Sequence, residues 1–111
     1  MAGDPDREIR VVAVCGGSGG SLFSAAAAAG ADVLVTSDLR HHTASESLEA
    51  GGPALVDAAH YATEWPWLPV AAELLEDDLC GRIQVDVSER STDPWNRHLG
   101  DDGVPAEQSA G

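Results

Sequence analysis

A histidine and a glutamate four residues apart, His60 and Glu64, form a pair of side chains with the potential to bind a metal ion. On a helix, residues at this spacing share a face, with Cβ atoms ~5–6 Å apart. An imidazole and a carboxylate placed in this way can close on one ion or bridge two. Taken alone, the same spacing more often marks a solvated surface pair. The metal interpretation is favoured by position, because the pair directly follows a predicted strand.

A second polar group contains Asp38, His41 and His42, just after another predicted strand. Ligands of α/β proteins bind beyond the carboxyl ends of the strands, so these side chains are candidates for lining a site. Adjacent histidines point to opposite sides, so at most one of the two is expected to face a given centre. The alternative is that all three are solvated loop residues.

The third candidate is the glycine-rich run Gly16, Gly17, Ser18 and Gly19, between a predicted strand and a predicted helix. Backbone N–H groups in such a turn can bind an anion. The alternative is a tight turn that needs positive φ. The run is not a dinucleotide fingerprint, because Leu22 occupies the position of the third glycine. It also lacks the Gly-Lys-Ser/Thr ending of a P-loop.

Hydrophobic patterning predicts the elements that position these groups. Residues 9–15 are β-branched and apolar, which is typical of a strand covered on both faces, whereas 82–88 alternate like an edge strand with one solvated face. Ser21 and Thr43 are the predicted helix N-caps, and Thr43 forms a capping box with Glu46. The predicted strands are 9–15, 32–36, 54–58 and 82–88, and the predicted helices are 21–29, 43–50 and 60–79.

This alternation of strands and helices predicts an α/β fold, a parallel-rich sheet with helices on its faces. Parallel strands end at a common edge, so the three polar groups are expected to converge there. Residues 1–8 resemble a linker, and the polar residues 96–111 are expected to form a disordered acidic tail.

Composition excludes several classes of function. The chain has 111 residues, with 19 acidic side chains against six arginines and no lysine, and a formal charge of −13. Nucleic acids and anionic membrane surfaces require clustered cations, so neither is an expected partner. The two cysteines form neither a CxxC motif nor a disulfide framework. Without a recognisable signal peptide or membrane span, the expected location is the cytoplasm.

Three ordered runs resemble the NIF-three-like dinuclear metal centre family, also called GTP cyclohydrolase 1 type 2 homologs. They are Val11-Val12-Ala13-Val14-Cys15-Gly16-Gly17-Ser18-Gly19, Gly30-Ala31-Asp32-Val33-Leu34-Val35-Thr36-Ser37-Asp38-Leu39-Arg40-His41-His42 and Asp57-Ala58-Ala59-His60-Tyr61-Ala62-Thr63-Glu64. The C-terminal region of the family has the same order: a strand, a Gly-Gly-Ser-Gly turn, "Ala-Asp-x-x-x-Thr-Gly-Asp-x-x-x-His" and "Gly-His-x-x-x-Glu". Ser37 and Ala59 stand where the family usually has glycine, and both are small enough to be tolerated.

The resemblance covers residues 9–95 and implies the C-terminal part of a NIF-three-like fold. It implies that His60 and Glu64 bind divalent cations (zinc, manganese or iron), and that Asp38, His41 and His42 line the site. Family members are at least about twice this length, and their N-terminal half supplies a His-His-Pro motif and an aspartate. Nothing before residue 9 matches these, so the chain resembles a truncated or late-started reading frame.

Two functions follow from the resemblance. In the first, the complete protein is a metal-dependent hydrolase acting on a nucleotide such as GTP, with the glycine turn holding phosphate. In the second, it is a non-catalytic metal-binding or scaffold protein. The family assembles as a toroidal hexamer, so the expected partner is the protein itself.

Overall fold

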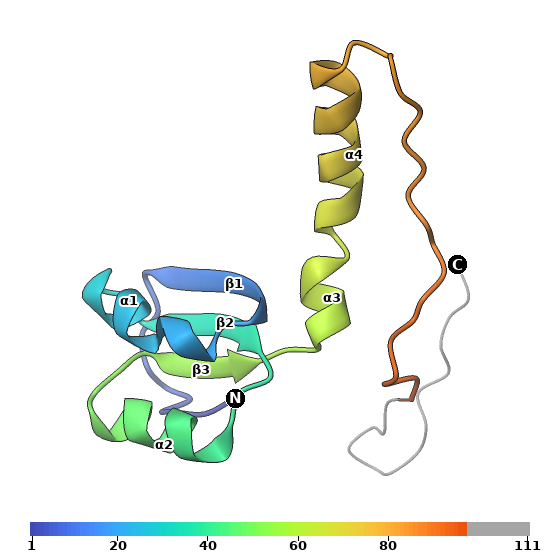
Figure 1. Ribbon diagram of the computed structural model, residues 1–111. Coiled ribbons are helices and arrows are strands. Elements are labelled where there is room, and N and C mark those ends of the chain that lie inside the picture. Colours follow the sequence, from blue (N-terminus) through green and yellow to red (C-terminus); the bar gives the residue numbers. More distant parts are fainter. Residues whose placement is uncertain (98–111) are drawn as a thin grey trace.

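A computed structural model describes residues 1–97, and this part of the chain contains a three-stranded parallel sheet (Figure 1). The strands β1 (Val12–Ser18), β2 (Val33–Ser37) and β3 (Ala54–Asp57) lie in the order β1-β2-β3. Ala13 pairs with Leu34, which pairs in turn with Leu55. The predicted α/β fold with a parallel sheet is confirmed.

Two helical crossovers connect the strands and cover one face of the sheet. The 3-10 helix η1 (Gly20–Leu22) and helix α1 (Phe23–Ala28) join β1 to β2, and α2 (His41–Glu49) joins β2 to β3. Leu34 and Leu55 are each 1% exposed and form the core with alanines of the first crossover. Phe23 and Leu48 pack against this cluster from the two helices. The small core explains why two short helices, of which α1 is rich in alanine, suffice to cover this face.

The amino end of the sheet is held by one carboxylate, that of Asp32. Its Oδ2 accepts the backbone N–H groups of Arg10 and Val11, each at 2.8 Å, and the N–H of Asp32 donates to the Val11 carbonyl at 2.8 Å. The two backbone hydrogen bonds to the carboxylate lower the pKa of Asp32 below its usual value, and the bond from Val11 contributes most. Ala2 forms an antiparallel bridge with Leu55 of β3. The aspartate of the "Ala-Asp-x-x-x-Thr" motif therefore joins β1 to β2.

The expected first strand is shifted and less covered than its sequence suggests. It runs from Val12 to Ser18 and so includes Gly16 and Gly17, which were predicted to lie in a turn. Val12 is 53% and Val14 74% exposed, so the prediction that both faces of this strand are covered is wrong for this chain. The reason is topological, because β1 is at the edge of the sheet and both crossover helices pack on the other face.

The helix boundaries also differ from prediction. Helix α2 begins at His41, two residues before the predicted start, and Arg40 is its N-cap. The hydroxyl of Thr43 donates to the Arg40 carbonyl at 3.0 Å, so Thr43 lies in the first turn and is not the cap. Ser21 likewise lies inside η1 and is not the predicted cap of α1.

The long helix predicted at 60–79 is divided into α3 (His60–Glu64) and α4 (Trp67–Asp78). The break falls at Trp65 and Pro66, because proline has no N–H to continue the helical ladder. Helix α3 packs against β1 and β2, whereas α4 extends away from the sheet (Figure 1). Within residues 1–97, no helix is long and apolar enough to cross a membrane.

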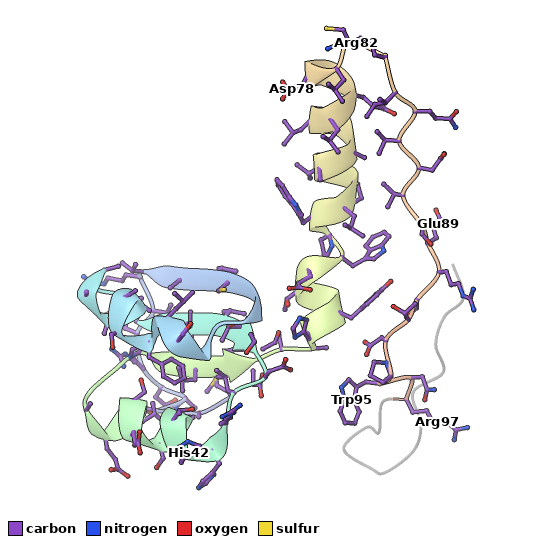
Figure 2. All side chains as sticks on the ribbon, in the orientation of Figure 1. His42, Asp78, Arg82, Glu89, Trp95 and Arg97 are labelled. Atoms are coloured by element: carbon purple, nitrogen blue, oxygen red, sulfur yellow. The ribbon has the colours of Figure 1, made fainter. Side chains whose placement is uncertain are left out.

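The strand predicted at 82–88 is wrong, since the structure gives no strand after β3 up to residue 97. Residues 82–97 form an extended segment that runs back beside α4, with Glu89 and Trp95 along it (Figure 2). Val85 and Val87 are half-buried and line a cavity with Leu68 and Leu75 of α4. A helix has satisfied its own backbone groups, so it can cover the valines but cannot pair with the segment as a strand. Most of the tail predicted at 96–111 lies outside the described residues.

Candidate functional site

The candidate site is at the carboxyl edge of the sheet, where β2 ends and α3 begins. The Nδ1 atom of His60 lies 2.6 Å from Oδ2 of Asp38, and its Nε2 lies 3.2 Å from Oε2 of Glu64. His60 therefore lies between two carboxylates, one from the end of β2 and one from the next turn of its own helix. The predicted convergence of Asp38, His60 and Glu64 is what the structure shows.

Thr63 fastens α3 to the strand ends. Its Oγ1 accepts the backbone N–H of Gly17 at 2.9 Å and donates to the His60 carbonyl at 2.8 Å. The Ser37 hydroxyl lies 3.1 Å from the same oxygen. Because Thr63 lies between His60 and Glu64 in sequence, these bonds hold the helix that carries both side chains against the strand ends. The sequence contained one sign of this role, a hydroxyl residue inside the His-x-x-x-Glu spacing.

The two glycines of β1 allow α3 to approach closely. Gly17 has φ of +68°, and a Cβ there would collide with the Glu64 carboxylate and lie 3.2 Å from Nε2 of His60. A Cβ on Gly16 would lie 2.9 Å from the Thr63 carbonyl oxygen. Larger residues at these two positions would push α3 away from the strand.

The backbone of Gly17 is already used within the fold. Its N–H donates to Thr63, and its carbonyl accepts the hydroxyl of Thr36 at 2.8 Å, a side chain that is fully buried. The positive φ supports the conformational interpretation of the glycine run at this residue. Anion binding by the run of Gly16, Gly17, Ser18 and Gly19 stays a prediction, and the Gly17 N–H does not contribute to it.

The charge of the site is governed by His60. The hydrogen bond that the imidazole donates to Asp38 is the largest cause that raises the pKa of His60 above the ordinary value. Partial burial opposes this shift, and the charge of Glu64 adds to it. Asp38 itself has a backbone φ of +55°, which aspartate tolerates better than most residues. In the absence of a metal, the imidazole is thus favoured in its protonated form between two carboxylates.

His41 and His42 are not brought to this cluster. They are the first two residues of α2 and both are exposed, and Figure 2 shows His42 on α2, apart from α3. Neither forms a hydrogen bond or ion pair with Asp38, His60 or Glu64 in the part of the chain described. Their assigned role of lining the metal site stays a prediction, as do the ligand roles of His60 and Glu64. Among residues 1–97, no three or more His, Cys, Asp or Glu side chains are grouped so as to hold a metal ion.

Comparison with known proteins places this arrangement in a family. Residues 1–94 match the model of the Duf34/NIF3 (NGG1p interacting factor 3) family. The chain belongs to this family.

Its similar relatives carry a common name. A Streptomyces coelicolor protein named GTP cyclohydrolase 1 type 2 homolog is 50% identical over 103 residues, covering 89% of this chain and 36% of its own length. A Mycobacterium tuberculosis protein of the same name is 50% identical over 95 residues, covering 86% of this chain and 25% of its own length. The chain therefore spans about a quarter to a third of the curated relatives it matches.

Solved structures of the family share the fold. A Bacillus cereus protein related to NIF3 matches with a TM-score of 0.75 at 30% identity, over 85% of this chain and 26% of its own. A Staphylococcus aureus protein matches with a TM-score of 0.69 at 33% identity, over 85% of this chain and 31% of its own. The sheet and its helices are thus a recurring part of larger chains.

Proposed function

We propose that this chain supplies His60 and Glu64 as two ligands of a divalent-metal centre, with Asp38 orienting the histidine. The observation that supports it is the position of His60, whose Nδ1 is held by Asp38 while Nε2 faces Glu64 at 3.2 Å. Zinc, manganese and iron are the candidate ions, because each accepts imidazole and carboxylate ligands.

The spacing of the two candidate ligand atoms fits a common ion. Two ligands bound at ~2.0–2.2 Å to one tetrahedral ion lie roughly 3.3 Å apart. The 3.2 Å between Nε2 of His60 and Oε2 of Glu64 is close to this value. When His60 is protonated, its Nε2–H occupies the same gap, so metal binding would replace a proton.

The Asp38 contact fixes the histidine for this role. An Nδ1–H that donates to a carboxylate leaves the Nε2 lone pair directed at the metal and makes it more basic. Asp38 is 57% exposed on its side chain and lies at a strand end, so it can hold the imidazole without being a ligand itself.

The remaining ligands are proposed to come from the rest of the family fold. A centre normally has three or more protein ligands, and this chain offers two. The chain spans 36% of its Streptomyces coelicolor relative, which leaves ample room for them. In a complete protein, bound metal would polarise a substrate and generate hydroxide. The name GTP cyclohydrolase 1 type 2 homolog, carried by the relatives, supports hydrolysis of a nucleotide as the proposed activity.

A second candidate is a non-catalytic metal-binding scaffold that assembles as a homo-oligomer, a hexamer in the full-length protein. It is favoured by the exposure of Val12 and Val14 on a sheet face that the helices leave uncovered. In either case we propose a cytoplasmic protein without nucleic-acid or membrane partners, in keeping with the formal charge of −13.

Calorimetric titration of the chain with zinc or manganese tests the ligand assignment. We expect a dissociation constant no tighter than micromolar, abolished by His60→Ala and retained by His42→Ala, the matched control. Unchanged binding in His60→Ala would refute the assignment, and tight binding of two ions per chain would show that other ligands exist. GTP hydrolysis by a complete, metal-loaded relative distinguishes the hydrolase from the scaffold, whereas this chain alone should show none.

A further inference from the structure

A pocket of about 350 Å³ lies next to the candidate metal ligands. It is lined by Ser18, Gly20, Ser21, Asp38, Arg40 and Thr43. These residues come from the end of β1, from η1, from the link between β2 and α2, and from the first turn of α2. The volume is within the range of ~300–1,000 Å³ typical of small-molecule sites. Asp38 belongs both to this pocket and to the His60 cluster, so a molecule in the pocket would lie beside the proposed centre.

Arg40 gives the pocket its positive charge. Its guanidinium forms no hydrogen bond or ion pair with another residue among 1–97, although the chain carries 19 acidic side chains. A guanidinium presents its N–H groups as a rigid fork that matches two oxygens of a phosphate. An arginine without a carboxylate partner in so acidic a chain is therefore suited to an anion from outside.

Hydroxyl groups supply further donors around Arg40. The side chains of Ser18 and Ser21 form no hydrogen bond elsewhere within the described part of the chain, so each can donate to a ligand oxygen. The Thr43 hydroxyl donates instead to the Arg40 carbonyl at 3.0 Å, which holds the backbone of the arginine in place. A Cβ on Gly20 would have only Leu39 nearby, at 3.9 Å, so that side of the pocket stays open.

We propose that this pocket binds the phosphate group of a phosphorylated small molecule, with Arg40 as the principal contact and Ser18 and Ser21 as supporting donors. The proposal rests on the proposed function and extends it, because it names the residues that would hold the phosphate of a substrate beside His60 and Glu64. The Asp38 carboxylate, on the shared wall, opposes an anion, but it is engaged by His60 at 2.6 Å. A cation bound at His60 and Glu64 should therefore increase phosphate affinity, and phosphate should increase metal affinity by the same factor.

The experiment is calorimetric titration of the metal-free chain with inorganic pyrophosphate. We expect binding to weaken at least tenfold in Arg40→Gln and by a few fold in Ser21→Ala, and to strengthen in Asp38→Asn. Arg90→Gln is the matched control, because it removes the same charge from an exposed position on the extended segment. Equal weakening by the two arginine variants, or the absence of pyrophosphate binding by the wild-type chain, would overturn the proposal.

Two further measurements separate the outcomes. In the wild-type chain, pyrophosphate should shift the amide NMR signals of Ser18, Ser21 and Arg40, and shifts confined to other residues would contradict the site whatever the variants do. Zinc titration of Arg40→Gln should match the wild type, because Arg40 is no proposed ligand. If the wild-type chain binds pyrophosphate but not zinc, the metal proposal is rejected and the phosphate proposal is retained.

Discussion

A methyl group at position 17 would occupy space now held by the Glu64 carboxylate. The substitution Gly17→Ala therefore carries two costs, the positive φ of +68° and the collision with the metal-site side chains. The first costs about 1–2 kcal/mol for a non-glycine residue. We predict that Gly17→Ala loses this amount and more in the free energy of unfolding and also loses zinc binding.

Gly30 provides the matched control for this prediction. Its φ of +73° is nearly the same, but a Cβ there meets nothing within 4 Å. Gly30→Ala should thus show the backbone cost alone, with zinc affinity unchanged. Chemical denaturation and calorimetry on both variants give the comparison, and equal effects of the two substitutions on zinc affinity would show that Gly17 acts only through its backbone.

Protonation of His60 competes with metal binding. The pKa of His60 is raised above 6.5, first by the hydrogen bond that it donates to Asp38. The stability contributed by this proton is therefore fully present below about pH 6.5 and is lost as pH rises through the raised value. Metal needs the Nε2 lone pair, so metal affinity should rise over the same interval. We predict that affinity for manganese increases as pH rises above about 6.5, through the raised pKa of His60, with release of a proton. Affinity that falls with pH would contradict it.

The same pair gives a direct test of the cause. Asp38→Asn removes the largest contribution to the raised pKa of His60, so the imidazole should titrate closer to its ordinary value. Asp57→Asn, at the end of β3, is the control, because Asp57 is not among the groups that shift this pKa. NMR titration of the His60 ring in both variants measures the difference.

At the level of elements, α3 depends on the hydroxyl of Thr63. Thr63→Val keeps the shape of the side chain but leaves the N–H of Gly17, a buried residue, without its acceptor. An unsatisfied buried donor costs about 1–3 kcal/mol. We predict a loss of that size in the free energy of unfolding, together with weaker metal binding, since His60 and Glu64 move with α3. Thr63→Ser retains the hydroxyl and should restore most of both. A fully stable Thr63→Val variant would show that α3 is held by other contacts.

Features that depend on neighbouring residues could be predicted from the sequence, whereas specific contacts between distant residues could not. The apolar runs around Leu34 and Leu55 predict β2 and β3 correctly, because a strand that is buried on both faces has apolar residues at consecutive positions. The proximity of Asp38 and His60 was also predictable, since parallel strands end at one edge. The role of Thr63 was harder to predict, because a hydroxyl inside the His-x-x-x-Glu spacing does not identify its partner, and Gly17 is 46 positions away.

The failed prediction of a strand at 82–88 has a similar cause. An alternating apolar pattern, here Ile83, Val85 and Val87, indicates that one side of an extended segment is covered, but it does not indicate which element covers it. In the structure α4 provides the cover. The early start of α2 arises because Arg40, not the better-capping Thr43, is at the point where the chain turns into the helix.

At the scale of the whole molecule, one face of the sheet is left without a layer. Both crossover helices pack on the side of Leu34 and Leu55, and α3 reaches only the strand ends (Figure 1). The opposite side presents Val12 and Val14, which are 53% and 74% exposed, on an edge strand. Exposed apolar residues beside an open strand edge favour association of sheets.

We therefore predict that the purified chain is oligomeric or poorly soluble despite its formal charge of −13. Val14→Glu places a charge on the exposed face of β1 without removing a core residue, and it should shift the chain toward monomer. Ser91→Glu adds the same charge at an exposed position of the extended segment and should leave the association unchanged. Sedimentation velocity over a range of concentrations measures the three proteins. A monomeric wild-type chain would contradict the prediction. An equal shift in both variants would show that association responds to net charge and does not involve the valine face, because only Val14→Glu alters the surface expected to be buried.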